Sequence, residues 1–356
     1  MRLSLRFPDG RRVPVRIGRG LWALAPRVFP SRPSRVVVVA DAGMPLRHPI
    51  LLMSAFRKAR IPVDLLRFRG GEGAKRLATL ERLARQCARL GLGRDGALVA
   101  LGGGVAGDLT GLLAALYLRG VPLLQCPTTL LAQVDAALGG KCAVDLPEGK
   151  NLLGTFHQPI AVLCDLDTLK TLPDRRLREG LAEIAKCAML DGPVAFTWLE
   201  RHAEALVRRE PKALEKAIGL AVRVKAAHVG DDERDVRGLR ERLNLGHTLA
   251  HAAEAVAGYR GLSHGEAVAA GLVAACAVAQ RQGVLKDAAL PGRLETLLLH
   301  LRLPTRFPRR LHAARLLAAA GRDKKVRGNR IRMGLPVRLG RTVAGPVTLD
   351  RAAFLR

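Results

Sequence analysis

Three of the nine histidines in this chain fall within one short stretch, LNLGHTLAHAAEAVAGYRGLSHGEAVAAG, at residues 243–271. His247 and His251 are four residues apart in an alanine-rich pattern that predicts a helix, so their imidazoles share one helical face. His264 follows and is succeeded directly by glycine and glutamate. A histidine taken alone is more often a core or surface residue, but this spacing is also a common zinc-binding geometry. The stretch therefore identifies candidate metal ligands.

A carboxylate that could complete the metal site lies in the segment GLAEIAKCAML. Glu183 and Lys186 are three residues apart and share one face of an otherwise apolar predicted helix. A charge on such a helix needs a partner, which is either a simple glutamate–lysine surface pair or a metal ion. With the histidines, Glu183 offers more ligands than the three that a catalytic metal needs beside an open position. The spacing does not decide which three are used.

A glycine-rich turn, GGGVAGD, follows the predicted strand GALVAL and occupies residues 102–108. It matches the GxGxxG spacing, in which glycines let the backbone approach a pyrophosphate at the start of a helix. The acidic residue that usually ends a strand about 20 residues downstream is missing, whereas Asp41 ends a predicted strand upstream. The turn is either a dinucleotide site with a different strand order or a glycine turn that only packs.

The next segment, PTTLLAQVDAALGGKCAVDLPEGKNLLGTFHQP at residues 127–159, gathers hydrogen-bonding side chains beside glycines. Lys141 and Lys150 each follow a glycine directly. The polar residues near them are Thr128, Thr129, Asp135 and Asn151. A single lysine here would be explained by a solvated polar loop, but the set together favours a site for phosphate or hydroxyl groups.

The elements that must position these residues fall into two classes. Residues 34–43, 75–91 and 96–104 read as strand, helix and strand, which predicts a mostly parallel α/β sheet. From about Leu172 onward the pattern changes to long alanine- and leucine-rich helices, with few strand candidates before IRMGLPVRL near residue 331. We therefore expect an α/β domain at residues 1–172 and a mainly helical domain at residues 173–356.

Composition narrows the class of protein. The 59 lysines and arginines against 31 acidic residues give a net charge of +28, which attracts anionic ligands. The basic residues are dispersed and aromatic residues make up only 3%, so we expect no specific nucleic-acid partner. Six cysteines without a CxxC pair predict reduced thiols. Since no signal peptide and no apolar stretch of about 18 residues is present, we expect a cytoplasmic protein.

Several motifs in a fixed order resemble the 3-dehydroquinate synthase family. They are GGEGAK (70–75), GGGVAGDLTG (102–111), YLRG (117–120), PTTLLAQVDAALGGK (127–141), GKNLLGTFHQP (149–159), LAEIAK (181–186), LRERLNLGHTLAH (239–251), HGEAVAAG (264–271) and DKK (323–325). The resemblance covers nearly the whole chain. It implies an NAD-binding α/β domain similar to that of glycerol dehydrogenases, a helical domain that carries a divalent metal, usually zinc with cobalt as the alternative, and a homodimer.

The resemblance also assigns roles to individual residues. The implied metal ligands are Glu183, His247 and His264, which leaves His251 to bind substrate or relay protons. The implied NAD-binding residues are Asp41, Glu72, Lys75, Gly103, Gly104, Asp108, Thr128, Thr129, Lys150 and Thr171. The implied substrate-binding and catalytic residues are Arg119, Asp135, Lys141, Asn151, Lys186, Lys225, Arg240, Asn244, His251 and Lys325 or its neighbour Lys324.

The implied reaction converts 3-deoxy-D-arabino-heptulosonate 7-phosphate into 3-dehydroquinate and phosphate, a lyase step of the shikimate pathway. In that chemistry a metal lowers the pKa of substrate hydroxyls while NAD takes a hydride, after which phosphate leaves by elimination. NADH then returns the hydride, and the opened ring closes by an intramolecular aldol reaction. NAD is therefore regenerated in every turnover.

Some positions depart from the family pattern: Cys142, Asp145, Cys187, Ala188 and Ala250. None of them removes an implied metal ligand or a charged substrate contact. An acidic Asp145 beside an anion site is expected to weaken phosphate binding, and Ala250 to add a methyl group where helices touch.

Two alternatives stay open. Another sugar-phosphate cyclase, making an aminated quinate, a valiolone or an inosose, would be indicated by altered residues at Lys141, Lys150 or Arg240, and none is altered. A catalytically idle paralogue would instead use its positive surface to bind nucleic acid or an acidic protein. Salt-dependent DNA binding without turnover would identify this second case.

Overall fold

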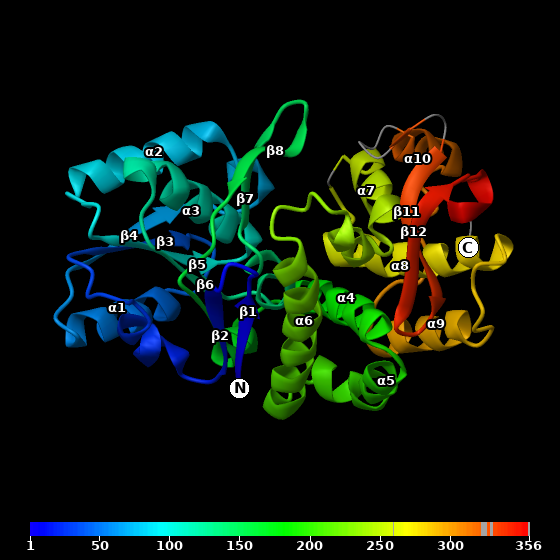
Figure 1. Cartoon of the computed structure of the whole chain (residues 1–356), viewed down its shortest axis with the longest axis horizontal. Coiled ribbons are helices and arrows are strands. Elements are labelled where there is room, and N and C mark those ends of the chain that lie inside the picture. The colour runs from blue at the N-terminus through cyan, green and yellow to red at the C-terminus, as the bar shows by residue number, and fades with distance from the viewer. Residues whose placement is uncertain (259, 322–325, 328–329, 355–356) are drawn as a thin grey trace. The chain divides into compact units, whose positions relative to one another are not determined.

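The computed structural model describes residues 1–258, 260–321, 326–327 and 330–354, which fold into two compact units (Figure 1). The first unit comprises Met1–Pro173 and Val229–Arg234, and the second comprises Asp174–His228 and Asp235–Arg356. The first is an α/β unit and the second is mainly helical, which confirms the expected fold class. The domain boundary expected after residue 172 stays a prediction.

A seven-stranded sheet forms the centre of the first unit, in the order β1-β2-β9-β6-β5-β3-β4. Its strands are β1 (Arg2–Arg6), β2 (Arg12–Gly18), β3 (Val36–Asp41), β4 (Val63–Phe68), β5 (Ala97–Gly102), β6 (Leu123–Pro127) and β9 (Ala161–Asp165). Every neighbouring pair is parallel except the β1–β2 hairpin. Strands β3 and β5 read VVVVAD and ALVALG, the continuous apolar runs of strands that are buried on both faces.

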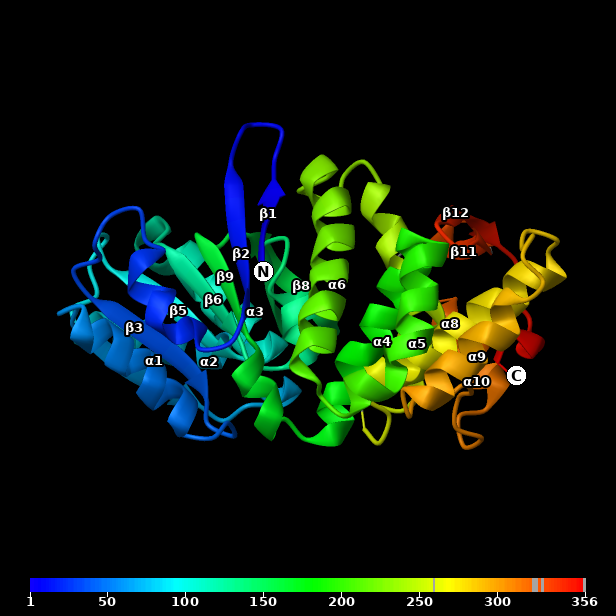
Figure 2. The same ribbon diagram turned by 90° about the horizontal axis from the view of Figure 1, so that it is seen from below.

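Helices cover both faces of this sheet (Figures 1 and 2). Helix α1 (Arg47–Lys58) packs on one face, and α2 (Leu77–Arg89) and α3 (Gly104–Leu116) pack on the other. Alternate residues of β3 point to opposite faces of the sheet and pack in separate hydrophobic cores. Val36 packs in the core that contains Phe56 of α1, and Val37 packs in the core that contains Leu83 of α2. A two-stranded antiparallel hairpin, β7 (Lys141–Leu146) and β8 (Gly149–Phe156), is attached to α3.

A short return segment, residues 229–234, completes the first unit. The carboxylate of Glu233 receives hydrogen bonds from the Arg11 guanidinium, at 2.6 and 3.2 Å, and from Gln158 Nε2 at 3.0 Å. The backbone of Gly230 approaches Arg6 so closely that a Cβ there would lie 2.5 Å from the Arg6 carbonyl oxygen. The segment is therefore fastened to the β1–β2 hairpin and to the residues that precede β9.

One helix of the second unit, α8 (His264–Arg281), lies in its interior, and its residues from Ala267 to Ala279 are all buried. The others are α4 (Asp174–Asp191), α5 (Pro193–Val207), α6 (Pro211–Asp231), α7 (His247–Val256), α9 (Leu290–His300) and α10 (Ala313–Ala320). An antiparallel sheet of β10 (Val326–Arg327), β11 (Arg330–Arg338) and β12 (Arg341–Val347) confirms the strand expected near residue 331. No helix in the described residues is long and apolar enough to span a membrane.

Candidate active site

The glycine turn lies where the strand order of the sheet reverses. The chain leaves β3 outward to β4 and returns to β5 on the other side of β3. Asp41 at the end of β3 and Gly102 at the end of β5 are therefore neighbours, and a Cβ on Gly102 would lie 3.5 Å from the Asp41 Cβ. Ligands of doubly wound sheets bind at the carboxyl ends of strands at such a reversal. Of the two interpretations of the turn, this topology favours a dinucleotide site.

The start of α3 and the end of β6 border the same turn. Gly103 and Gly104 stand at the N-terminus of α3, where free backbone N–H groups favour an anion. Thr129 follows β6 with its side chain near Gly103, and the Thr128 N–H donates to the Gly102 carbonyl oxygen at 2.8 Å. The structure thus brings together four predicted cofactor residues from two segments of the chain.

A buried ionic cluster lies beside the α3 N-terminus. Lys75 is only 5% exposed, and its Nζ lies 2.5 Å from Asp108 Oδ2 and donates to Asn151 Oδ1. Burial raises the pKa of Asp108 to about 6, although the Lys75 ammonium acts in the opposite direction. Nearby, Lys150 Nζ lies 3.3 Å from Glu72 Oε1. Three segments far apart in the sequence therefore supply one charged site.

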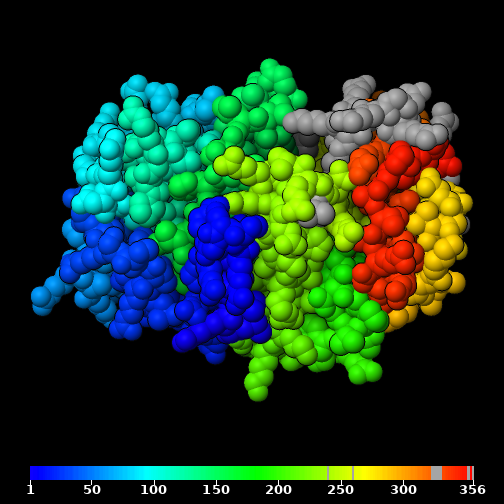
Figure 3. Space-filling model, viewed as in Figure 1, coloured from blue at the N-terminus to red at the C-terminus, as the bar shows by residue number. Residues whose placement is uncertain are grey.

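The β7–β8 hairpin, which projects from the first unit in Figures 1 and 3, carries Lys141, Asp145 and Asn151. Asp145 Oδ1 accepts a hydrogen bond from the Asn151 N–H at 2.8 Å, and the Asp145 N–H donates to the Lys75 carbonyl oxygen at 2.7 Å. Asn151 has a φ of +54°, which asparagine tolerates better than most residues. Asp145, which departs from the family pattern, therefore holds the backbone at Asn151 in place. The side chain of Lys141 is exposed.

The other predicted residues of the first unit lie in short irregular segments. Arg119 is exposed and has a φ of +67° just after α3, and Asp135 belongs to a single π-helical turn, Ala132–Ala136. Such turns are frequent at functional sites. Thr171 Oγ1 lies 3.3 Å from His48 Nε2 and 3.3 Å from an Arg47 guanidinium nitrogen. Burial lowers the pKa of His48, a residue that no spacing in the sequence distinguishes.

In the second unit, one carboxylate and two imidazoles converge from three helices. Glu183 Oε1 of α4 lies 3.3 Å from His247 Nε2 of α7 and 3.5 Å from His264 Nε2 of α8. One ligand atom from each of the three lies within 4.8 Å of the others. His247 Nδ1 lies 3.2 Å from the Leu245 carbonyl oxygen, so an N–H there leaves Nε2 free of a proton to bind a metal.

The Glu183 carboxylate fits a metal ion by its environment as well as by its position. Glu183 is 1% exposed, and neither of its oxygens receives a hydrogen bond of normal geometry from the described residues. Lys186 Nζ lies 2.5 Å from Oε2, so the glutamate–lysine pair exists inside the unit and not on its surface. Burial raises the pKa of Glu183, but Lys186 and then His247 outweigh it and hold the pKa well below its usual range. An ionised, buried carboxylate beside two imidazoles is a set that zinc or cobalt prefers.

The other histidine of the opening stretch lies next to this set. His251 is exposed, with its ring centroid 5.5 Å from that of His247 and 6.3 Å from that of His264. His264 Nδ1 lies 3.4 Å from Glu254 Oε2, and His251, Glu254 and His264 form a second group of close ligand atoms. Carboxylates that accept from the second nitrogen of a metal-binding histidine orient its ring. Sequence reasoning missed Glu254, whose signal was its place three residues after His251 on the same helix.

Close packing of α8 on α4 places His264 opposite Glu183. A Cβ on Gly265 would lie 2.3 Å from the Glu179 Cα, one helical turn before Glu183. The start of α8 is capped by Ser263 and Glu266, and Glu266 also binds the Arg175 guanidinium with distances of 2.7 and 2.9 Å. The glycine and glutamate that follow His264 in the sequence therefore position this histidine.

Gly265→Ala is expected to destabilise the protein by about 1–3 kcal/mol and to weaken metal binding, because the new methyl group pushes α8 away from the backbone of α4. Gly292→Ala is the matched control, since a Cβ at Gly292 on α9 would contact nothing within 4 Å. Chemical denaturation and metal analysis of both variants measure the effect. Equal stability of the two variants would show that the contact is unimportant.

The predicted cationic residues of the second unit are largely buried. Lys186, Lys225 and Arg240 are 3%, 8% and 4% exposed. Lys225 is carried by α6, and Arg240 and Asn244 by the short 3-10 helix Leu239–Asn244 that precedes α7. Lys324 and Lys325 lie outside the described residues.

Ala250, Cys187 and Ala188 depart from the family pattern and are buried in helices, so the residues at these positions contribute to packing.

Solved structures of two sugar-phosphate cyclases are similar to this chain. A 2-deoxy-scyllo-inosose synthase in complex with carbaglucose-6-phosphate, NAD+ and Co2+ is 26% identical, with a TM-score of 0.89 and coverage of 99% of this chain and 98% of that chain. A 2-epi-5-epi-valiolone synthase from Streptomyces hygroscopicus subsp. jinggangensis 5008, with NAD+ and Zn2+ bound, is 29% identical, with a TM-score of 0.83 and coverage of 95% and 93%.

Sequence comparison identifies a more similar relative. The 3-dehydroquinate synthase of Symbiobacterium thermophilum is 42% identical over 339 residues, which are 94% of each chain. The family model described as 3-dehydroquinate synthase N-terminal matches residues 65–179, and the one described as 3-dehydroquinate synthase C-terminal matches residues 180–326. These matches include the glycine turn, the β7–β8 hairpin and all three converging ligands. The chain belongs to the 3-dehydroquinate synthase family.

Proposed function

We propose that this protein is a 3-dehydroquinate synthase, a lyase that converts 3-deoxy-D-arabino-heptulosonate 7-phosphate into 3-dehydroquinate and phosphate. The observation that carries the proposal is the buried Glu183 carboxylate, which faces two imidazoles and a buried lysine in a chain of this family. The 42% identity to a synthase, against 26% and 29% to the inosose and valiolone cyclases, favours this substrate over theirs.

The residues present fit both cofactors. Zn2+ or Co2+ would be held by Glu183, His247 and His264, and NAD by the strand ends at Asp41 and the glycine turn. When bound, the metal acidifies substrate hydroxyls and NAD accepts and returns a hydride. Glu254 orients the His264 ring through Nδ1, so that Nε2 faces Glu183.

The protein's cations would bind and orient the anionic substrate. Arg240 suits the substrate carboxylate, because a guanidinium binds a carboxylate with two parallel hydrogen bonds. Lys186 is fixed beside Glu183 and would donate to a substrate oxygen at the metal. Lys141 and Asn151 of the β7–β8 hairpin would stabilise the charge of the departing phosphate.

Phosphate release from the heptulosonate phosphate tests the proposal directly. Purified protein is assayed with and without NAD, and after the metal has been removed and restored. Release that needs both NAD and metal, with 3-dehydroquinate as the product, supports it. No release despite bound metal and NAD would overturn the proposal and favour another phosphorylated sugar or an idle paralogue, for which salt-dependent DNA binding is then measured.

Lys141→Ala is expected to keep its metal and to lose about 100-fold or more in kcat/KM, because the variant loses a cation that stabilises developing negative charge. Lys58→Ala, which removes an exposed lysine at the end of α1, is the control and should retain wild-type turnover. Steady-state kinetics and metal analysis measure both effects. Wild-type kinetics for Lys141→Ala would exclude this role.

We also propose a homodimer and a cytoplasmic location. The dimer follows from the family resemblance and is tested by the mass of the protein in solution. All six cysteines are buried and none forms a disulfide bond, which is typical of proteins from a reducing compartment.

A further inference from the structure

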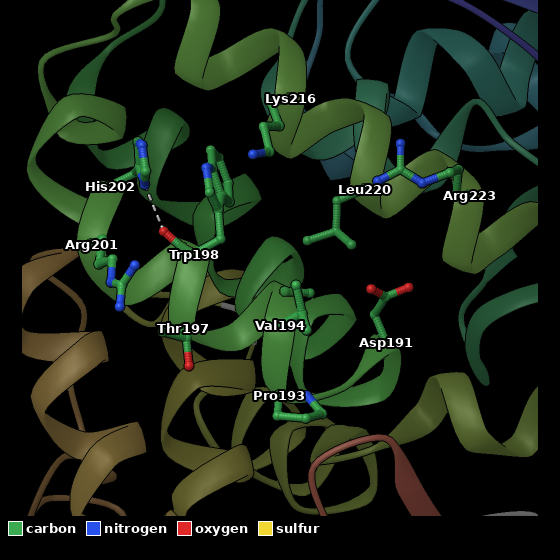
Figure 4. Close-up of a pocket in the computed structure, with 11 residues that line it drawn as sticks. Asp191, Pro193, Val194, Thr197, Trp198, Arg201, His202, Lys216, Leu220 and Arg223 are labelled. Atoms are coloured by element: carbon green, nitrogen blue, oxygen red, sulfur yellow. Dashed lines mark hydrogen bonds between the residues drawn. The ribbon is translucent and has the colours of Figure 1, made fainter.

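The second unit contains a cavity of about 600 Å³ away from the metal centre. Helices α5 and α6 line it together with Asp191, the last residue of α4 (Figure 4). Asp191 follows Glu183 by eight residues, which is about 12 Å along the helix axis. The cavity is therefore separate from the predicted active site, although both share α4. Its volume is in the range of small-molecule sites.

The charges around this cavity select for an anion. Arg201, Lys216 and Arg223 line it, against the single carboxylate of Asp191. Among the described residues, no carboxylate forms an ion pair with any of these three cations. Many surface arginines of this chain do form such pairs, for example Arg175 and Arg293. The cavity thus presents three cations and one carboxylate, a net positive charge.

The remaining wall of the cavity is mostly apolar and includes the indole ring of Trp198. The Trp198 ring stacks on His202 at 4.5 Å between centroids, and His202 Nδ1 lies 2.8 Å from the Trp198 carbonyl oxygen. Lys216 Nζ lies 4.6 Å from the centre of the same indole ring. Val194 is 84% exposed and lines the cavity with Leu220 (Figure 4). An aromatic wall beside cations recognises an apolar body that carries a negative charge.

We propose that this cavity binds a small aryl carboxylate. An inorganic anion would leave the apolar wall unused, a neutral aromatic molecule would leave the cations unused, and a cation would be repelled by them. The carboxylate would be bound by Arg223 and Lys216, and the aromatic ring would pack against Trp198 and Leu220. The proposal goes beyond the synthase function and does not depend on it.

Tryptophan fluorescence can report on this cavity alone. The chain has two tryptophans, so Trp22→Phe leaves Trp198 as the only one. The holoenzyme of this variant is titrated with 3-phenylpropanoate, with acetate as the anion without the ring, and with 3-phenylpropanol as the ring without the charge. Calorimetry on the unmodified holoenzyme repeats each titration, because Trp22 is buried and its replacement can disturb the fold.

We expect a saturable response to 3-phenylpropanoate and binding at least about tenfold weaker for acetate and 3-phenylpropanol. Arg223→Gln and Lys216→Gln should each weaken 3-phenylpropanoate binding about fivefold or more. Arg315→Gln, an exposed arginine of α10 outside the cavity, should leave it unchanged. Absence of saturable binding by both methods would overturn the proposal. The same holds if acetate binds equally well, or if both cavity variants bind like Arg315→Gln.

Discussion

His264→Ala is expected to lose its bound metal and its synthase activity together. The side chain supplies one of three converging ligand atoms, and its Nε2 lies 3.5 Å from Glu183 Oε1. Loss of a residue that only orients a ligand weakens metal binding by about 10–100-fold, so loss of the ligand itself should cost at least about 100-fold. Metal content after dialysis and phosphate release from the heptulosonate phosphate measure the two effects.

Two other histidine variants make this prediction specific. His300→Ala removes an exposed histidine at the end of α9 and should retain both metal and activity. His251→Ala should retain metal but lose activity, because His251 lies beside the three converging ligands and not among them. A full metal content in His264→Ala would refute the ligand assignment. Metal loss in His251→Ala would instead favour the second group, His251 with Glu254 and His264.

Lys75→Met is expected to destabilise the first unit by about 3 kcal/mol and to abolish measurable NAD binding. The variant leaves the Asp108 carboxylate, whose side chain is 19% exposed, without the ammonium that lies 2.5 Å away, and an unpaired charge at such a partly buried position is costly. It also removes the hydrogen bond to Asn151. Chemical denaturation and calorimetric titration with NAD measure the two effects, with the exposed Lys58→Met as the control.

A double variant separates stability from cofactor binding. Lys75→Met with Asp108→Leu replaces the buried ammonium and the partly buried carboxylate by apolar groups, a replacement that is often neutral or stabilising for a buried ion pair. We expect the double variant to recover most of the lost stability but not NAD binding. If NAD binding recovers with stability, the pair only supports the fold and does not contact the cofactor.

Much of this architecture could be predicted from local sequence patterns. Continuous apolar runs such as VVVVAD predicted the parallel sheet, and alanine-rich periodicity predicted the helices. Strand order could not be predicted in this way, because it depends on contacts between distant segments. The sequence alone therefore did not predict that Asp41 lies next to the glycine turn, because this depends on the pairing of β3 with β5.

The metal centre shows the same limit. Spacing alone suggested that His247 and His251 form a pair, since both lie on one helix. The family resemblance selected His247 with His264, and the structure brings these two to Glu183 from different helices. The hydrogen bond that Asp145 accepts from the Asn151 N–H could not be predicted from local sequence either. The sequence indicated only that the negative charge of Asp145 would weaken phosphate binding.

The return segment at residues 229–234 gives the chain three covalent crossings between its two units, at 173/174, 228/229 and 234/235. The second crossing lies within α6, a continuous helix. Neither unit is therefore one uninterrupted stretch of the gene product, and a fragment that ends at residue 173 lacks the carboxylate that binds Arg11 and Gln158. Simple truncation should yield an incomplete half, whereas a fragment with residues 229–234 grafted back through a designed linker restores its missing piece.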